Sequence, residues 1–152
     1  MKAFQYILFV LLLFSGCATK SPISNRYVSK KKNIEHLAKL GKSHWEKRVD
    51  HKDAKLSNHF LSKAVELDPK NSDIMALYSR SCYFIGRFSA INDKSADSSF
   101  INGFTKSWQY IINSKDFQNG FKSIEGDSLA KTIAGLENLS EHLLPVAYWW
   151  AE

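Results

Sequence analysis

The spacing of apolar residues changes near Asn33, and from there onward it is the spacing of α-helices. Small or apolar residues recur at intervals of three and four, which places their side chains on one helix face. The members of this first stripe are Ile34, Leu37, Ala38, Gly41 and Trp45. The pattern predicts an amphipathic helix that begins at Asn33 and ends at a polar break at residues 50–53.

Two further stripes meet at residues 64–72. They consist of Leu56, Phe60, Leu61, Ala64 and Leu67, and of Ile74, Leu77, Tyr78, Ser81 and Ile85. Between them, Pro69 disfavours the helical conformation of Asp68, and Asn71 or Ser72 can cap the next helix. We therefore predict a helical hairpin with a tight turn at this joint, whose second helix stops at Gly86.

The second half of the chain predicts four more helices. A polar loop at residues 90–99 precedes the strongest aromatic stripe, for which Asp97 or Ser98 is the expected cap. Its members are Phe100, Phe104, Trp108, Ile111 and Ile112. Residues 117–124 predict a short helix that ends before Gly126.

Two helices remain towards the end of the sequence. Asp127 or Ser128 can cap the first, whose expected inward residues are Leu129, Ile133, Leu136 and Leu139. Pro145 fits the first turn of the second helix.

The first residues of the chain have the pattern of a secretory signal. Lys2 is followed by an apolar run at residues 3–14, which is shorter than the roughly 20 residues of a membrane-spanning helix. The run ends in Leu13-Phe14-Ser15-Gly16-Cys17, which resembles the lipobox of bacterial lipoproteins. The resemblance implies cleavage before Cys17 and acylation of that residue, which would anchor the chain to a membrane surface. The alternative is an ordinary signal peptide with a chance cysteine.

The lipobox divides the chain into three predicted parts: a signal peptide at 1–16, a lipidated flexible linker at 17–32 and a helical domain at 33–152. By resemblance to sorted lipoproteins, Ala18 after the cysteine favours the outer membrane, facing the periplasm. Loss of Lys2 with the signal leaves a net charge of 20 − 15 = +5. Several of these charges lie in the linker, where they predict a solvated tether or attraction to anionic lipids. We expect no nucleic-acid binding.

The first hairpin has part of the tetratricopeptide pattern, which repeats about every 34 residues. Leu37, Leu40, Gly41 and His44 have the early spacings, and Ala64 stands five residues before the proline of the joint. The fold class predicted is all-α, with tetratricopeptide-like hairpin repeats in a right-handed superhelix. A second copy matches only in its first half, so the array is expected to be incomplete.

Five stretches together resemble one family, the T-component lipoproteins of TRAP transporters (TatT). They are GKSHWEKR at 41–48, AVELDPKN at 64–71, YFIGRF at 83–88, FINGF at 100–104 and LPVAYWW at 144–150. The resemblance implies a non-catalytic accessory protein that binds the periplasmic substrate-binding component of a TRAP system, a small organic or hydrophobic ligand, and further copies of itself as a homotrimer. Family members are longer, so truncation at the C-terminus is expected. The alternative is a general envelope adaptor or assembly lipoprotein.

The chemistry-bearing residues point to binding rather than catalysis. Tyr83, Phe84, Trp108 and Trp149 are the candidate ligand-binding residues, although their helical spacing also fits core packing. His44, His51, Asp50 and Asp53 cluster near the polar break without the spacing of a metal motif. Cys82 lies near the third stripe and is read as a small buried residue. No catalytic motif occurs, so we expect neither an enzyme nor a cofactor.

Overall fold

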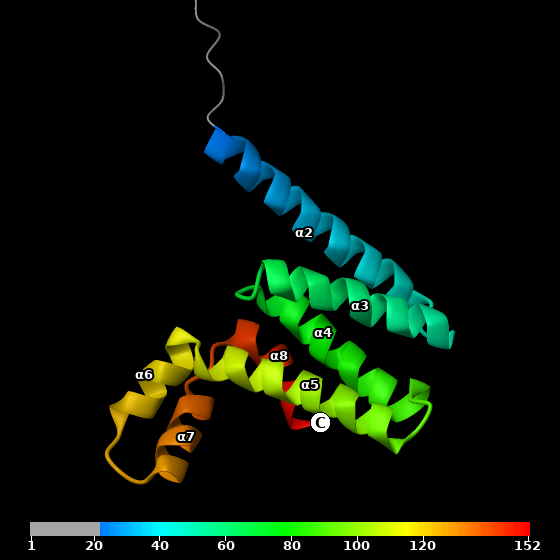
Figure 1. Cartoon of the computed structure of the whole chain (residues 1–152). Helices are drawn as coiled ribbons and strands as arrows, with labels where there is room; N and C mark the ends of the chain where they lie inside the picture. The colour runs from blue at the N-terminus through cyan, green and yellow to red at the C-terminus, as the bar shows by residue number, and fades with distance from the viewer. Residues whose placement is uncertain (1–21) are drawn as a thin grey trace, which may run out of the picture. The chain divides into compact units, whose positions relative to one another are not determined.

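The described part of the chain, residues 22–152 of a computed structural model, is helical and holds no β-strand (Figure 1). Its elements are α2 (Pro22–Glu46), α3 (His51–Leu67), α4 (Ser72–Phe84), a π-helical turn η1 (Ile85–Ser89), α5 (Asp93–Ile112), α6 (Lys115–Ser123), α7 (Ser128–Glu137), a 3₁₀ turn η2 (Glu141–Leu143) and α8 (Leu144–Ala151). The all-α class is therefore confirmed. The predicted signal peptide at 1–16 and Cys17 lie outside the described residues.

The chain divides into two units at residues 31 and 32. Of the first unit, the structure describes only residues 22–31, and these are helical. The helix start predicted at Asn33 is thus wrong, because α2 begins at Pro22, whereas the predicted lipidated linker at 17–32 stays a prediction. Proline at the start of a helix is preorganised for it, and the Arg and Lys residues that follow have good helix propensity. Apolar periodicity missed this segment because Tyr27 and Val28 are exposed.

In the second unit, α2 and α3 approach closely at Gly41. A Cβ atom added to Gly41 would lie 2.7 Å from Cγ of Leu61, a residue with no exposed surface. The buried Ser57 hydroxyl donates to the Gly41 carbonyl oxygen over 2.8 Å. Asp50 caps α3 by accepting from the Lys52 N–H. The break between the helices therefore lies at 47–50 rather than at the predicted 50–53.

The joint between α3 and α4 has the predicted form. The Asp68 N–H donates to the Ala64 carbonyl oxygen over 2.9 Å and ends α3. Asn71 accepts from the Ile74 N–H over 3.2 Å and caps α4. Ala64 and Ile74 are buried on either side of the turn. The sequence signals at Pro69 and Asn71 therefore place a helical hairpin correctly.

Gly86 does not stop the third helix, contrary to the prediction. The chain continues through the π-helical turn η1, and a Cβ atom added to Gly86 would lie 2.7 Å from Cζ of Phe100. The glycine therefore lets an aromatic ring rest on the backbone. The predicted loop at 90–99 is also wrong, because α5 begins at Asp93. Its cap is Asn92, which forms a capping box with Ser95 in place of the expected Asp97 or Ser98.

The buried face of α5 is built from small residues. Gly103 packs against Cys82 of α4, and the Ser107 hydroxyl lies 2.5 Å from the Ser79 hydroxyl. Ile111 is fully buried, whereas Phe104 of the predicted aromatic stripe is 52% exposed. Small side chains on both helices allow α4 and α5 to approach closely, which moves the aromatic rings to the edges of the contact.

The α6–α7 hairpin also packs through small residues, which allow its two helices to approach closely. A Cβ atom added to Gly120 would lie 2.3 Å from the Ala134 carbonyl oxygen, and one added to Gly135 would lie 2.8 Å from the Phe117 ring. Leu129 and Ile133, expected to face inward, are exposed. The hairpin packs through its glycines, because they allow a closer approach than leucine does.

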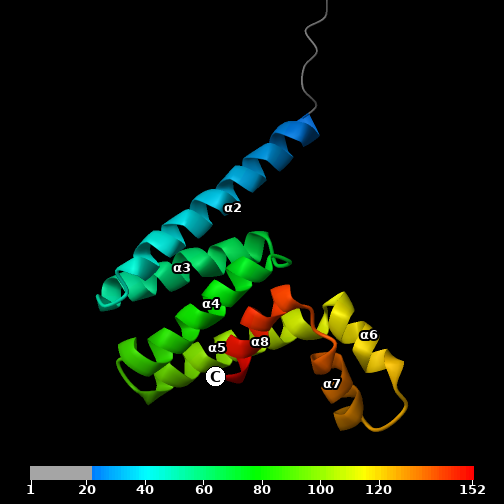
Figure 2. The same ribbon diagram turned by 180° about the vertical axis from the view of Figure 1, so that it is seen from behind.

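Helix α8 packs against α4 and α5, which come much earlier in the sequence. Both views show it beside them, with α6 and α7 to one side (Figures 1 and 2). Val146 is fully buried and Leu143 nearly so. The core of this unit therefore lies between α3, α4, α5 and α8.

Candidate ligand-binding groove

The four aromatic residues proposed from the sequence fall into two separate clusters. Tyr83 lies 5.8 Å from Trp149 between ring centroids. Phe84 is nearby in the same cluster, 5.4 Å from the Trp45 ring. Trp108 belongs to the second cluster and stacks on Trp150 at 4.9 Å. The structure therefore does not bring the four candidates together around one cavity, and their role in ligand binding stays a prediction.

Arginine side chains complete the first cluster. The Arg80 guanidinium lies 4.8 Å from the Trp45 ring and 5.3 Å from the Trp149 ring. The Arg48 guanidinium lies 4.6 Å from the Trp45 ring and 5.9 Å from the Phe84 ring. Such cation–π contacts stabilise by roughly 0.5–2 kcal/mol each. They join α2, α4 and α8, so the cluster has a clear packing role.

The polar residues near the first turn form a local pair. His44 Nδ1 lies 2.5 Å from Asp53 Oδ1, and the His44 ring stacks on Phe60 at 5.5 Å. Across residues 22–152, no group of three or more His, Cys, Asp or Glu side chains is arranged to hold a metal ion. The pair connects the end of α2 to the start of α3.

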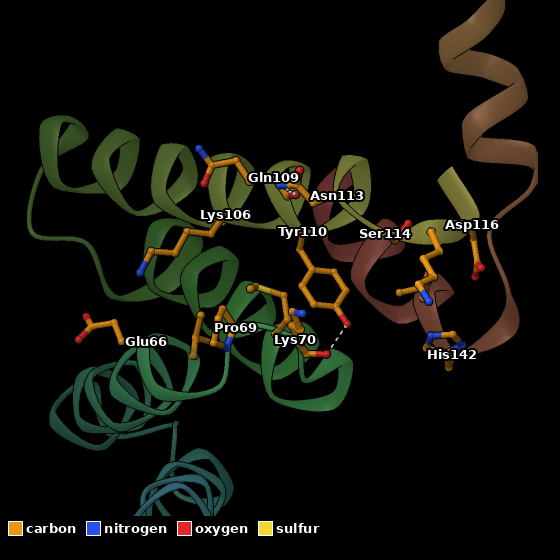
Figure 3. Close-up of a pocket in the computed structure, with 14 residues that line it drawn as sticks. Glu66, Pro69, Lys70, Lys106, Gln109, Tyr110, Asn113, Ser114, Asp116 and His142 are labelled. Atoms are coloured by element: carbon orange, nitrogen blue, oxygen red, sulfur yellow. Dashed lines mark hydrogen bonds between the residues drawn. The ribbon is translucent and has the colours of Figure 1, made fainter. Parts of the chain in front are cut away.

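An open groove of about 800 Å³ lies between the α3–α4 joint, α5, the start of α6 and η2 (Figure 3). Its lining includes the apolar Val65, Pro69, Met75 and Leu143, the polar Gln109, Tyr110, Asn113 and Ser114, and the charged or titratable Glu66, Lys70, Lys106, Lys115, Asp116 and His142. The volume falls within the range of roughly 300–1,000 Å³ that is typical of small-molecule sites.

Tyr110 fixes one wall of the groove. Its hydroxyl donates to the Lys70 carbonyl oxygen over 2.9 Å, which ties α5 to the joint (Figure 3). Burial raises the pKa of this hydroxyl, and the nearby carboxylates of Asp68 and Asp73 add to the effect. Tyr110 is therefore a neutral donor at physiological pH.

The Asp116 carboxylate fixes the other wall. It accepts hydrogen bonds from the hydroxyl and the backbone N–H of Ser140, and these lower its pKa. The Ser140 hydroxyl also lies 2.8 Å from His142 Nδ1. The Ser140 hydroxyl donates its proton to Asp116, so in the contact with His142 the serine oxygen accepts a hydrogen bond from Nδ1–H. The network holds η2 against the start of α6, and Asn138 adds a bond to the Asp116 carbonyl oxygen.

The groove lining carries three lysines and two carboxylates, so positively charged side chains outnumber negatively charged ones. Glu66 accepts from Lys63 over 3.0 Å, and this bond lowers the pKa of Glu66. Lys70, Lys106 and Lys115 form no ion pair within 4 Å in the part of the chain that the structure describes, although the charge of Lys106 also helps to lower the pKa of Glu66. The groove lining thus combines three lysine amines and two carboxylates with amides, hydroxyls and a few apolar side chains.

Sequence reasoning missed this groove, because its residues come from five elements (α3, α4, α5, α6 and η2) and mostly occupy polar positions between the apolar stripes. The joint was assigned a turn role alone, although Pro69 and Lys70 line the groove. The local signal in the sequence is a lysine shortly after each of two helix ends: Lys70 follows α3, and Lys115 follows α5.

No protein-family model, curated protein or solved structure matches this chain. Among the described residues, no helix has the length and apolar character needed to cross a membrane.

Proposed function

We propose that this chain is a non-catalytic, lipid-anchored accessory protein of a TRAP-type uptake system. It is held at the periplasmic face of the outer membrane through Cys17 and binds the periplasmic substrate-binding component. The homotrimer that the resemblance implies belongs to the same proposal.

The observation that carries the proposal is the packing role of the stretches that resemble the T-component family. The absence of a side chain at Gly41 leaves room for Leu61. Ala64, next to the joint, and Val146, in α8, are both fully buried. Residues far apart in the sequence thus meet in one helical core, as expected of residues that specify one fold. The groove adds support, because its lining suits binding rather than bond cleavage.

The finer fold, tetratricopeptide-like repeats in a right-handed superhelix, is part of this proposal. Consecutive helices α3, α4 and α5 pack on one another, and α6 packs on α7, which suits stacked hairpins. Helix α8 then covers α4 and α5, so that a short array gains the additional packing that it needs.

Co-purification of the full-length chain from a detergent extract of membranes tests this function. We expect the substrate-binding component of a TRAP system, identified by mass spectrometry, in stoichiometric amount with the chain. Genes for a TRAP membrane component and binding protein beside the chain's own gene would agree with this result.

The Cys17→Ser variant separates anchoring from partner binding. We expect it to leave the membrane fraction yet still bind the substrate-binding component. Recovery of a secretion or envelope-assembly complex in place of that component would favour the general adaptor and overturn the uptake function.

A further inference from the structure

We infer that one surface of the helical core docks an acidic segment of a partner protein. This arginine–aromatic surface spans α2, α4 and α8 and consists of Trp45, Arg48, Arg80, Phe84 and Trp149. The expected segment carries exposed carboxylates beside apolar side chains. The inference goes beyond the proposed function, because it concerns the docking surface and applies equally to an uptake partner and to an assembly partner.

Arg80 lies at the centre of the surface. Its half-buried guanidinium is held against two indole rings, 4.8 Å from Trp45 and 5.3 Å from Trp149. Contacts with ring faces leave the five N–H donors of a guanidinium unused. Across residues 22–152, Arg80 has neither a hydrogen-bond acceptor nor an ion-pair partner. The side chain is therefore preorganised to bind a carboxylate through two parallel hydrogen bonds.

Arg48 supplies a second positive charge on the same surface. Its Nη1 donates to the Trp45 carbonyl oxygen over 3.1 Å, and its other donors have no acceptor among the described residues. Because Trp45 contacts both guanidiniums, the two charges lie on either one ring or its immediate border. Their proximity makes the surface complementary to a segment with several carboxylates.

The acidic residues closest to Arg48 in the sequence do not neutralise this surface. Asp50 caps α3 by accepting from a backbone N–H. Glu46 lines a separate hollow together with Lys39 and Lys42. Within the part of the chain that the structure describes, no carboxylate lies within 4 Å of the Arg48 guanidinium. The carboxylates that pair with these arginines are thus expected from a partner.

Exposed apolar side chains border the arginines. Val49 is 91% exposed, Phe88 59% and Tyr148 56%. The Phe88 ring lies 5.0 Å from Phe84, and the Tyr148 ring lies 4.9 Å from Trp149, so both continue the surface. Aromatic residues and arginine are enriched in protein–protein interfaces, whereas lysine is depleted there. This composition favours a protein partner over an anionic lipid surface.

Tryptophan indole N–H signals give a direct assay, because Trp45 and Trp149 belong to the surface and Trp108 belongs to the other aromatic cluster. The full-length chain in detergent micelles, with its tryptophans labelled with nitrogen-15, is titrated with a peptide of eight glutamates. Tryptophan-to-phenylalanine variants assign the signals. We expect saturable shifts of Trp45 and Trp149, with Trp108 as internal reference. A peptide of eight glutamines should bind about tenfold more weakly.

Arginine variants test the contacts. Arg80→Gln should weaken binding of the glutamate peptide by about tenfold. Arg80→Lys keeps the charge but lacks the planar fork, so we expect binding about threefold weaker. Lys122→Gln is the matched control for loss of one positive charge, because Lys122 is exposed on α6 outside the surface, and it should leave binding unchanged. An unchanged Trp108 signal without peptide verifies that each variant folds.

Arg48→Gln keeps the test decisive if Arg80→Gln fails to fold, because it removes the second charge of the same surface. It should also weaken binding of the glutamate peptide relative to Lys122→Gln. Equal affinities of the arginine variants and the Lys122 control would overturn the inference, as would equal binding of the two peptides.

An anionic lipid surface is the competing occupant. Shifts of Trp45 and Trp149 when phosphatidylglycerol is added to the micelles, with none from the glutamate peptide, would overturn the inference and assign the surface to the membrane. Each of these failures leaves the co-purification result intact, so the two proposals can fail separately.

Discussion

The contact between Gly41 and Leu61 predicts a measurable energetic coupling between α2 and α3. Leu61→Ala removes a fully buried side chain, which we expect to lower the free energy of unfolding by about 2–5 kcal/mol. Gly41→Ala adds a methyl group 2.7–2.8 Å from Cγ and Cδ2 of Leu61, well inside normal contact. Such overpacking costs about 1–3 kcal/mol, offset by roughly 1 kcal/mol of helix propensity.

The double variant should be less destabilised than the sum of the single variants. Once Leu61 is truncated, the methyl group at residue 41 enters the space that the leucine vacates, so the overpacking disappears while the propensity gain remains. We expect a coupling of about 1–3 kcal/mol in favour of the double variant.

Urea unfolding of the full-length chain, followed by far-ultraviolet circular dichroism in constant detergent, measures this coupling. The matched control combines Gly41→Ala with Ile111→Ala, a fully buried residue on α5. There the two effects should add within about 0.5 kcal/mol. Additivity in the Gly41–Leu61 cycle as well would refute the close approach of α2 and α3.

Three further predictions test other parts of the fold. Gly120→Ala places a methyl group 2.3 Å from the Ala134 carbonyl oxygen, so we expect faster amide hydrogen exchange throughout α6 and α7; unchanged exchange would contradict that packing. Asn92→Ala breaks the capping box with Ser95 and should cost about 1 kcal/mol in urea unfolding, whereas no loss would argue against a helix start at Asp93. The lowered pKa of Asp116 contributes stability above the ordinary pKa of a carboxyl group, 3.8, and that stability is lost as the pH falls through the folded-state value. Asp116→Asn should therefore flatten the acid limb of a stability–pH curve, and an unaltered acid limb would count against the Ser140 hydrogen bonds.

The sequence predicted those features that depend on local chemistry. Pro69 and Asn71 act on their immediate neighbours, so the joint between α3 and α4 was placed correctly. The apolar face of α2 was found because its side chains repeat at helical spacing. These signals need no knowledge of the partner helix.

Features set by packing between distant segments were predicted wrongly. Gly86 looks like a helix stop, but contact with Phe100 determines its role. Leu129 looks like a core residue, but Gly120 and Gly135 allow an approach that leaves it exposed. Hydrophobic size was taken as a guide to burial, whereas the helix contacts here use small residues.

The groove could not be predicted for a related reason. Lys70 and Lys106 each look like an ordinary solvated residue, and only the fold brings them to one site. The aromatic candidates were easier to notice, because their stripes are strong, yet Trp108 and Trp149 belong to different clusters. Strong sequence patterns mark the core more readily than they mark a binding surface.

Direct binding between purified partners tests the central proposal most directly. The full-length chain in detergent micelles is immobilised, and the purified substrate-binding protein of a TRAP system from the same organism is passed over it. We predict saturable binding in the micromolar range or tighter, retained in Cys17→Ser. Absence of binding by this protein, with the chain shown to be folded by circular dichroism, would contradict the assignment to TRAP-type uptake.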